Sequence, residues 1–159
     1  MKNIDFQIKI QFCQLDELAQ DEQDLIQTAI KATDNSNAKY SHFHVGAALL
    51  LNDGTVVIGA NQENAVFPLG LCAERTAIFS SQAQFPEKPI LKLAIAARNQ
   101  NGIMDNPVSP CGSCRQVILE MEDRYNQPIR VLLYGKRGVY AVDTIKDLLP
   151  LSFVDSSMR

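Results

Sequence analysis

The sequence has little of what marks several large protein classes. It contains no tryptophan, and only 8 glycines and 7 prolines in 159 residues, which excludes collagen-like and low-complexity chains. Its longest apolar run, residues 45–51, is far shorter than the roughly 18 residues that indicate a membrane span. Its 4 cysteines make up about 2.5% of the 159 residues, well below the roughly 8–10% that is typical of disulfide scaffolds. The chain is 46% hydrophobic, which predicts one globular domain over residues 1–159.

An excess of positive charge is also missing. The chain has 15 basic and 18 acidic side chains, a formal net charge of −3. Proteins that bind nucleic acid through its phosphates need a basic stripe, so we expect no nucleic-acid partner, and no membrane partner either. The first residues do not resemble a signal peptide. We therefore expect a cytoplasmic protein with a small, uncharged partner, in which reducing conditions favour thiol or metal chemistry for the cysteines.

Hydrophobic periodicity predicts alternating helices and strands. A helix is expected from residue 15 or 16 to the polar turn at 35–37. The turn Asn52-Asp53-Gly54, between apolar segments 45–51 and 55–60, predicts an antiparallel hairpin. Two further helices are expected at 72–82 and 111–125, and two buried strands at 90–97 and 129–134. A short strand is expected at 139–142 and a short helix at 144–149. A strand-helix-strand order implies a parallel crossover, so we predict an α/β fold of three α/β/α layers with a mixed, mostly five-stranded sheet.

Three of the four cysteines lie at the starts of two predicted helices. Cys111 and Cys114 are three residues apart, which places both sulfurs on one face of a first turn, and Cys72 opens the preceding helix. Helix N-termini favour thiolates. Three protein ligands are typical of a catalytic zinc site, whose fourth position stays open. The pattern therefore predicts about one zinc ion per chain.

Residues beside these cysteines can complete such a site. Three thiolates give a bound zinc ion a formal charge of −1, so Arg75 and Arg115 are candidates for donating hydrogen bonds to the ligand sulfurs. Glu74 follows Cys72 by two residues, a spacing that separates side chains on a regular helix. It can lie near the metal only where a loop joins the helix. In that position Glu74 is a ready general base and, once protonated, a general acid.

The cysteines also allow two different roles. A Cys-x-x-Cys pair at a helix start can be a redox pair. A structural zinc module is possible if Cys13, His42 or His44 supplies a fourth ligand, although that leaves Glu74 unexplained. We favour catalytic zinc over both, and expect Cys13 to be a packed free thiol.

Four ordered segments resemble the cytidine deaminase family, in its short form with three cysteine zinc ligands. The similarity runs from about residue 40 to residue 153. The segments that carry it are Tyr40-Ser41-His42-Phe43-His44-Val45-Gly46-Ala47-Ala48, Asn61-Gln62-Glu63-Asn64-Ala65, Cys72-Ala73-Glu74-Arg75-Thr76-Ala77 and Pro110-Cys111-Gly112-Ser113-Cys114-Arg115-Gln116-Val117. The resemblance implies a cytidine deaminase-like fold with Cys72, Cys111 and Cys114 as zinc ligands. It departs from the family at His44, where the family often has proline.

The resemblance further implies a reaction and a substrate site. The reaction is zinc-dependent hydrolytic deamination of cytidine and 2′-deoxycytidine, in pyrimidine salvage, with Glu74 moving the protons and ammonia released. Asn61 and Glu63 would hydrogen-bond the ribose hydroxyls, and Phe43 would pack against the base. Residue type alone favours a core position for Phe43 and a turn for Asn61.

The resemblance also implies roles for two aromatic residues and assembly into several subunits. Phe67 and Phe153 would help to wall the pocket, with Phe153 reaching into a neighbouring subunit of a homotetramer. Two alternatives stay open. One is a deaminase of a cytosine-containing antibiotic such as blasticidin S, whose substrate is cationic and lacks ordinary ribose hydroxyls. The other is a zinc-stabilised structural module, in which Glu74 would be dispensable.

Overall fold

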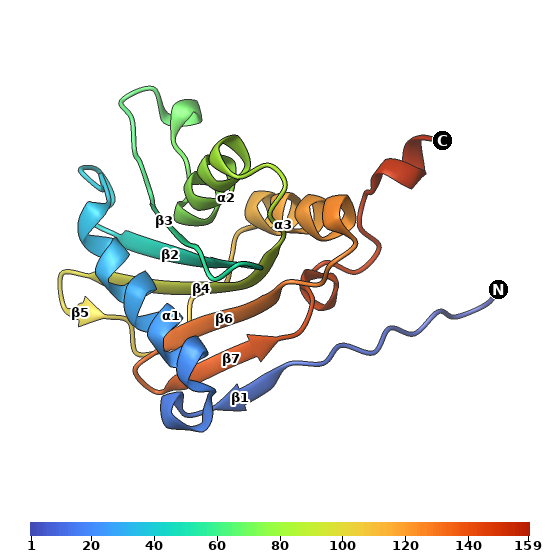
Figure 1. Cartoon of the computed structure of the whole chain (residues 1–159), viewed down its shortest axis with the longest axis horizontal. Helices are drawn as coiled ribbons and strands as arrows, with labels where there is room; N and C mark the ends of the chain where they lie inside the picture. The colour runs from blue at the N-terminus through green and yellow to red at the C-terminus, as the bar shows by residue number, and fades with distance from the viewer.

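The computed structural model describes residues 1–159 and shows three helices packed on the two faces of one sheet (Figure 1). None of the helices is both long and apolar enough to cross a membrane. The helices are α1 (Gln20–Ala32), α2 (Ala73–Gln84) and α3 (Gly112–Tyr125). The strands are β1 (Gln11–Cys13), β2 (His44–Leu51), β3 (Val56–Ala60), β4 (Ile90–Asn99), β5 (Gly102–Ile103), β6 (Arg130–Gly135) and β7 (Gly138–Val142).

The sheet is mixed, as the sequence predicts. Its strand order is β1-β7-β6-β4-β2-β3, with β5 paired to β4 at one end. Strands β4 and β6 are parallel, which confirms the expected crossover, and every other pair is antiparallel. The predicted hairpin is formed by β2 and β3. Gly54 in its turn has φ +87°, a conformation that glycine adopts without steric cost.

Two apolar clusters hold the three layers together. On one face, α1 packs Leu25 and Ile26 against small sheet residues such as Ala48 and Ala94. On the other face, α2 and α3 cover a larger cluster, to which they contribute Ile78 and Ile118. Figure 1 shows α1 on one side of the sheet and α2 with α3 on the other. The α/β/α layering predicted from the sequence is therefore confirmed.

The sheet has seven strands where the sequence predicts mostly five. The two additional strands are short: β1 has 3 residues and β5 has 2. Strands of this length carry almost no periodic signal. In addition, β1 pairs with a strand that is distant in sequence. The first helix also begins later than expected, at Gln20, after a 3-10 turn over Leu15–Glu17. The short C-terminal helix is a 3-10 helix, Ile145–Leu148.

A glycine on β3 brings α2 unusually close to the sheet. A Cβ atom at Gly59 would lie 2.4 Å from the carbonyl oxygen of Ala73 and 2.4 Å from the amide nitrogen of Ala77. Any larger residue would therefore push the first turns of α2 outward. This contact fixes the N-terminus of α2, where Cys72 precedes the helix, against the edge strand β3.

Candidate metal centre and substrate pocket

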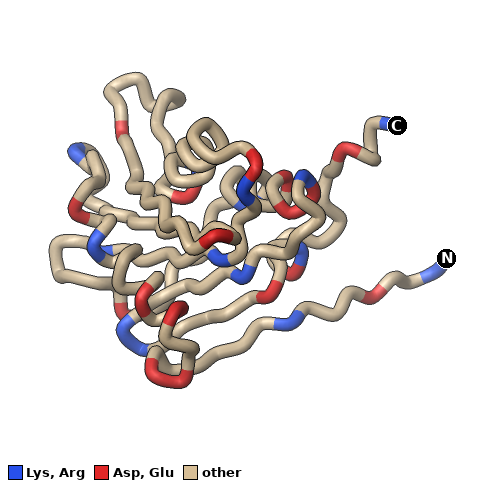
Figure 2. The backbone as a smooth tube through the Cα atoms, viewed as in Figure 1, with Lys and Arg blue, Asp and Glu red and all other residues tan.

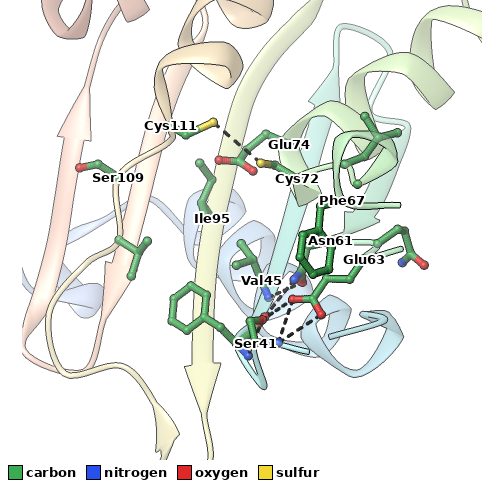
Figure 3. A pocket seen from close by; sticks show the side chains of 15 residues that line it. Ser41, Val45, Asn61, Glu63, Phe67, Cys72, Glu74, Ile95, Ser109 and Cys111 are labelled. Carbon is green, nitrogen blue, oxygen red and sulfur yellow. Dashed lines mark hydrogen bonds between the residues drawn. The ribbon is translucent and has the colours of Figure 1, made fainter. Parts of the chain in front are cut away.

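Three cysteine sulfurs converge at the N-termini of α2 and α3. Cys72 is the N-cap of α2, Cys111 is the N-cap of α3, and Cys114 lies in the first turn of α3. The Sγ atoms of Cys72 and Cys111 are 3.8 Å apart (Figure 3). All three Sγ atoms lie within 4.8 Å of one another. A tetrahedral zinc ion with Zn–S bonds of about 2.3 Å separates two sulfurs by about 3.8 Å. The donor set and its spacing therefore fit zinc.

Charge in this cluster is unevenly shared. The Cys114 thiol lowers the pKa of Cys72 to about 5, and Arg75 adds to the effect. Cys72 and burial together raise the pKa of Cys114. A thiolate at Cys72 therefore opposes ionisation of Cys114, since adjacent negative charges repel. A divalent cation removes that repulsion, which is the electrostatic reason to expect a metal here.

The two arginines that the sequence singled out lie differently. The Nη2 atom of Arg75 donates to the Sγ atom of Cys72 over 3.6 Å. Arg115 donates instead to two backbone carbonyls, from Nε to Pro110 at 2.9 Å and from Nη1 to Leu148 at 2.7 Å. Arg115 therefore ties the loop before Cys111 to the C-terminal segment, and no hydrogen bond joins it to any of the three cysteine sulfurs.

Glu74 lies beside the sulfurs, despite its spacing from Cys72. Cys72 has an extended backbone (φ −70°, ψ 156°), and the regular helix begins only at Ala73, so the angular spacing of a helix does not apply to this pair. The Glu74 side chain is buried, with the residue 4% exposed, and Figure 3 shows its carboxylate next to Cys72. Burial raises the pKa of Glu74. A buried carboxyl of this kind can act as a proton acceptor and, once protonated, as a proton donor.

A cavity of about 450 Å³ opens beside this cluster, within the size range of small-molecule sites. Its walls are mainly apolar and include Phe43, Phe67 and Ile95. Glu63 and Glu74 are the charged side chains among its lining residues, which include no lysine and no arginine. The cavity thus offers carboxylates and apolar surface, and no cation for a phosphate group.

Asn61 connects the pocket wall to the sheet. Its Oδ1 atom accepts a hydrogen bond from the Val45 amide at 2.8 Å, and its Nδ2 atom donates to the Phe43 carbonyl at 2.9 Å. These two bonds fix the backbone that carries Phe43, which is half-buried in the pocket wall. The structure thus places Asn61 and Phe43 together, each supporting the position of the other.

Glu63 is held by the loop before β2. Its carboxylate accepts hydrogen bonds from the Tyr40 amide at 2.7 Å and from the amide and hydroxyl groups of Ser41. The Ser41 hydroxyl is the main reason that the pKa of Glu63 is lowered. Glu63 therefore stays ionised at the rim of the cavity. Ser41 itself was not singled out from the sequence, although it lies within the segment that resembles the family's substrate segment.

The two outer aromatic residues occupy different places. Phe67 lines the cavity, is 74% exposed, and contacts Tyr40 edge to face with ring centroids 5.7 Å apart. Phe153 is 60% exposed and is not among the residues that line the cavity of its own chain. Its carbonyl accepts a hydrogen bond from Gln116 at 2.9 Å, which holds the C-terminal segment near α3.

The residues considered as a fourth zinc ligand lie apart from the sulfurs. The group that can hold a metal consists of the three cysteines Cys72, Cys111 and Cys114. The Nδ1 atom of His44 instead lies 2.6 Å from the Ser36 hydroxyl. Cys13 is partly buried on β1, and its Sγ atom approaches the Val139 carbonyl at 3.9 Å.

Sequence reasoning missed several lining residues as well as Ser41. Val108 and Ser109 belong to the loop between Pro107 and Pro110, and Leu71 directly precedes Cys72. The only sign of their role in the sequence was that they lie close to the cysteine motifs. Loop residues show no periodicity, so the sequence does not tell which way their side chains point.

Comparison with known proteins gives concordant results. Residues 19–126 match the family model described as cytidine and deoxycytidylate deaminase zinc-binding region. The chain is 39% identical over 139 residues to a cytidine deaminase of Halalkalibacterium halodurans, covering 87% of this chain and 98% of that protein. It is 39% identical over 128 residues to one of Mycobacterium tuberculosis, covering 79% and 84%. The crystal structure of a Burkholderia pseudomallei cytidine deaminase superposes with a TM-score of 0.70 at 39% identity, covering 82% of this chain and 97% of that one.

Proposed function

The chain belongs to the cytidine and deoxycytidylate deaminase family and is a hydrolase of the cytidine deaminase type, and from this premise we propose its substrates and chemistry. The reaction is hydrolytic deamination of cytidine and 2′-deoxycytidine to uridine and 2′-deoxyuridine, with release of ammonia. The observation that carries the proposal is the buried carboxyl of Glu74 beside three convergent sulfurs at one end of a nucleoside-sized cavity.

Zinc is the proposed cofactor, at one ion per chain, held by Cys72, Cys111 and Cys114. When bound, it supplies the Lewis acidity that makes water a nucleophile at neutral pH. Glu74 would accept a proton from the attacking water as its oxygen bonds to C4 of the base, and would deliver that proton to the adjacent ring nitrogen. It would then take the second proton from the same oxygen and pass it to the exocyclic amino group, so that the C4–N bond breaks, a carbonyl forms at C4 and ammonia leaves. Burial suits Glu74 to this role, because a raised pKa lets one carboxyl act first as base and then as acid.

The other end of the cavity is proposed to hold the sugar and the base. Ionised Glu63 can accept hydrogen bonds from ribose hydroxyls, and Asn61 keeps one amide hydrogen and one carbonyl lone pair beyond the bonds it already makes. Phe43 offers an apolar wall for the ring. Arg75, through its bond to Cys72, is proposed to offset the negative charge of the metal ligands.

The absence of cations from the cavity wall favours a free nucleoside over a nucleotide. A 5′-phosphate needs a nearby lysine or arginine, whereas the lining residues contribute Glu63 and Glu74. The test is a panel of cytidine, 2′-deoxycytidine, dCMP, cytosine and blasticidin S, followed by loss of the cytosine chromophore. We expect turnover of the two nucleosides. Preference for dCMP or for blasticidin S would replace the proposed substrate class by that one.

The assembly and setting are also proposals. We propose a single catalytic domain over residues 1–159 that acts in cytoplasmic pyrimidine salvage as a homotetramer. The exposure of Phe67 and Phe153 supports contacts with neighbouring subunits, with Phe153 contributing to a neighbour's pocket. Sedimentation analysis of the active protein tests this. A fully active monomer would contradict both the assembly and the role of Phe153.

A further inference from the structure

A row of apolar side chains runs along an extended N-terminal segment that precedes the residues matched by the family model. The N-terminal arm, residues 1–10, extends from β1 without regular secondary structure, and Figure 1 shows the N-terminus at its end well away from the sheet. Apolar residues occupy every second position from residue 4 to residue 12, and each is about half exposed or more. They are Ile4 (73%), Phe6 (53%), Ile8 (49%), Ile10 (48%) and Phe12 (55%). The family match begins only at residue 19.

The pattern of the arm is that of a strand without a partner. Strict alternation places one apolar and one polar face on an extended backbone. Residues 1–10 make no hydrogen bond to the rest of the chain, and the one ion pair joins Lys9 Nζ to Asp143 at 3.8 Å. An unpaired backbone edge combined with exposed apolar residues is a ready template for adding another strand.

The charges of the arm are arranged so that it complements itself. Figure 2 shows basic, acidic and again basic positions along it, which are Lys2, Asp5 and Lys9. If two arms pair antiparallel about Gln7, residue numbers on opposite strands sum to 14, so Asp5 faces Lys9 of a second copy, twice by symmetry. The apolar face then pairs Ile4 with Ile10 and Phe6 with Ile8. Charge and apolar pattern are thus both satisfied by a single register.

We propose that the N-terminal arm is a self-association element, which pairs with the arm of a second copy of this chain in this antiparallel register. The pairing continues the sheet beyond its β1 edge and joins two copies through a two-stranded ribbon. Among the antiparallel registers that keep the apolar residues on one face, this register alone brings Asp5 opposite a lysine, so the charges favour a second copy of the same sequence as the partner.

The body of the molecule offers cover for the apolar face of the ribbon. Phe6 and Ile8 line a groove together with Leu149, Pro150 and Leu151 of the C-terminal segment. A two-stranded ribbon in water is marginal unless its apolar face is packed against something. The groove supplies that surface on each copy.

Charge reversal tests the register directly. Asp5→Lys leaves only lysines to face one another, and Lys9→Asp leaves only aspartates. We expect each single variant to self-associate about tenfold or more weakly than wild type, since two attractive pairs become repulsive. An equimolar mixture of the two variants restores both pairs, so we expect its association to return to the wild-type level. Sedimentation equilibrium over a range of concentrations measures this.

Two further variants distinguish this register from a different pairing of the arms. The matched control Lys2→Asp changes a charge that has no charged partner in this register, and should associate as wild type. Gln7→Cys places a cysteine on the two-fold axis and should yield a 7–7 disulfide under mild oxidation, identified by peptide mapping, whereas Asn3→Cys should give no 3–3 disulfide. Wild-type association in the single charge variants, or a mixture that fails to recover, would overturn the proposal. Either result would favour an arm that packs on its own chain or on another protein.

Discussion

The two ends of the pocket are built in different ways. At the end proposed to hold the metal (the metal end), three cysteines and Glu74 lie on the N-termini of α2 and α3, which are anchored to the sheet by buried side chains. At the end proposed to bind the sugar (the sugar end), Asn61, Glu63 and Phe67 lie on the connection between β3 and α2. Glu74 is 4% exposed, whereas Phe67 is 74% exposed.

This difference separates chemistry from recognition. Groups that move protons or hold a metal need fixed geometry and low water content, which helix ends packed on a sheet provide. Groups that recognise a sugar must admit and release it, which a loop permits. Damage at the metal end should therefore lower the rate of the chemical step, and damage at the sugar end should mainly raise KM.

The largest effect is expected from loss of one metal ligand. Cys111→Ser keeps a good N-cap for α3, because serine is favoured at that position, but removes one of three thiolates. We expect zinc content to fall from about one ion per chain to well below that value, and activity to become undetectable. Metal analysis and circular dichroism separate this from unfolding. The control is Cys13→Ser, on β1 and outside the cluster, which should keep both zinc and activity.

The next effect is expected at Glu74. Glu74→Gln retains the shape and burial of the side chain but removes proton transfer, so kcat should fall by roughly 10²–10⁴-fold, the usual contribution of a general acid or base. Zinc content should stay at the wild-type level, and KM should change little. Wild-type turnover by this variant would refute the general-base assignment and revive the interpretation of a structural zinc module.

The metal end was also the more predictable end. The convergence of Cys72, Cys111 and Cys114 was predictable because the spacing of cysteines at helix starts is a local property of the sequence. The hairpin and the parallel crossover were readable for the same reason. Even Glu74 could be placed, on the condition that the helix begins after Cys72, which is where it begins.

The sugar end and the sheet edges were less predictable, because both depend on contacts between distant residues. Nothing local indicates that Ser41 would bond Glu63 across 22 positions, or that Arg115 would bond the Leu148 carbonyl. Strands β1 and β5 were missed because pairing defines them more than periodicity does. The family resemblance identified residues at this end, but it did not predict the hydrogen bonds that hold them in place.

A moderate effect is expected at Glu63, and it should appear mainly in KM, whereas the effect at Glu74 appears in kcat. Glu63→Gln keeps acceptor capacity toward the Tyr40 and Ser41 amides but removes the charge offered to ribose hydroxyls. Hydrogen bonds to charged groups are worth about 1.5–3 kcal/mol, so the KM for cytidine should rise roughly tenfold to hundredfold, with kcat changed much less. Steady-state kinetics measures both constants. Glu87→Gln, an exposed carboxylate after α2, is the matched control and should leave both unchanged. A fall in kcat without a change in KM would erase the functional difference between the two ends.

The smallest effect is expected at Ser41, and it should depend on pH. The Ser41 hydroxyl is the main cause of the lowered pKa of Glu63, so Ser41→Ala should raise that pKa toward the usual glutamate value of about 4.3. At pH 7.5 Glu63 is ionised in both proteins, and KM should differ by less than about threefold. As the pH falls toward 4.5, Glu63 becomes protonated earlier in the variant, so its KM for cytidine should rise at a higher pH than that of wild type.

The control for this pH effect is Ser109→Ala, which changes a hydroxyl in the same cavity that has no bond to Glu63. Its dependence of KM on pH should follow wild type. Because acid also titrates other groups, only the displacement between Ser41→Ala and Ser109→Ala reports on Glu63. If the two profiles coincide, the Ser41 hydroxyl does not govern the ionisation of Glu63, and the sugar end is held by the Tyr40 and Ser41 amides alone.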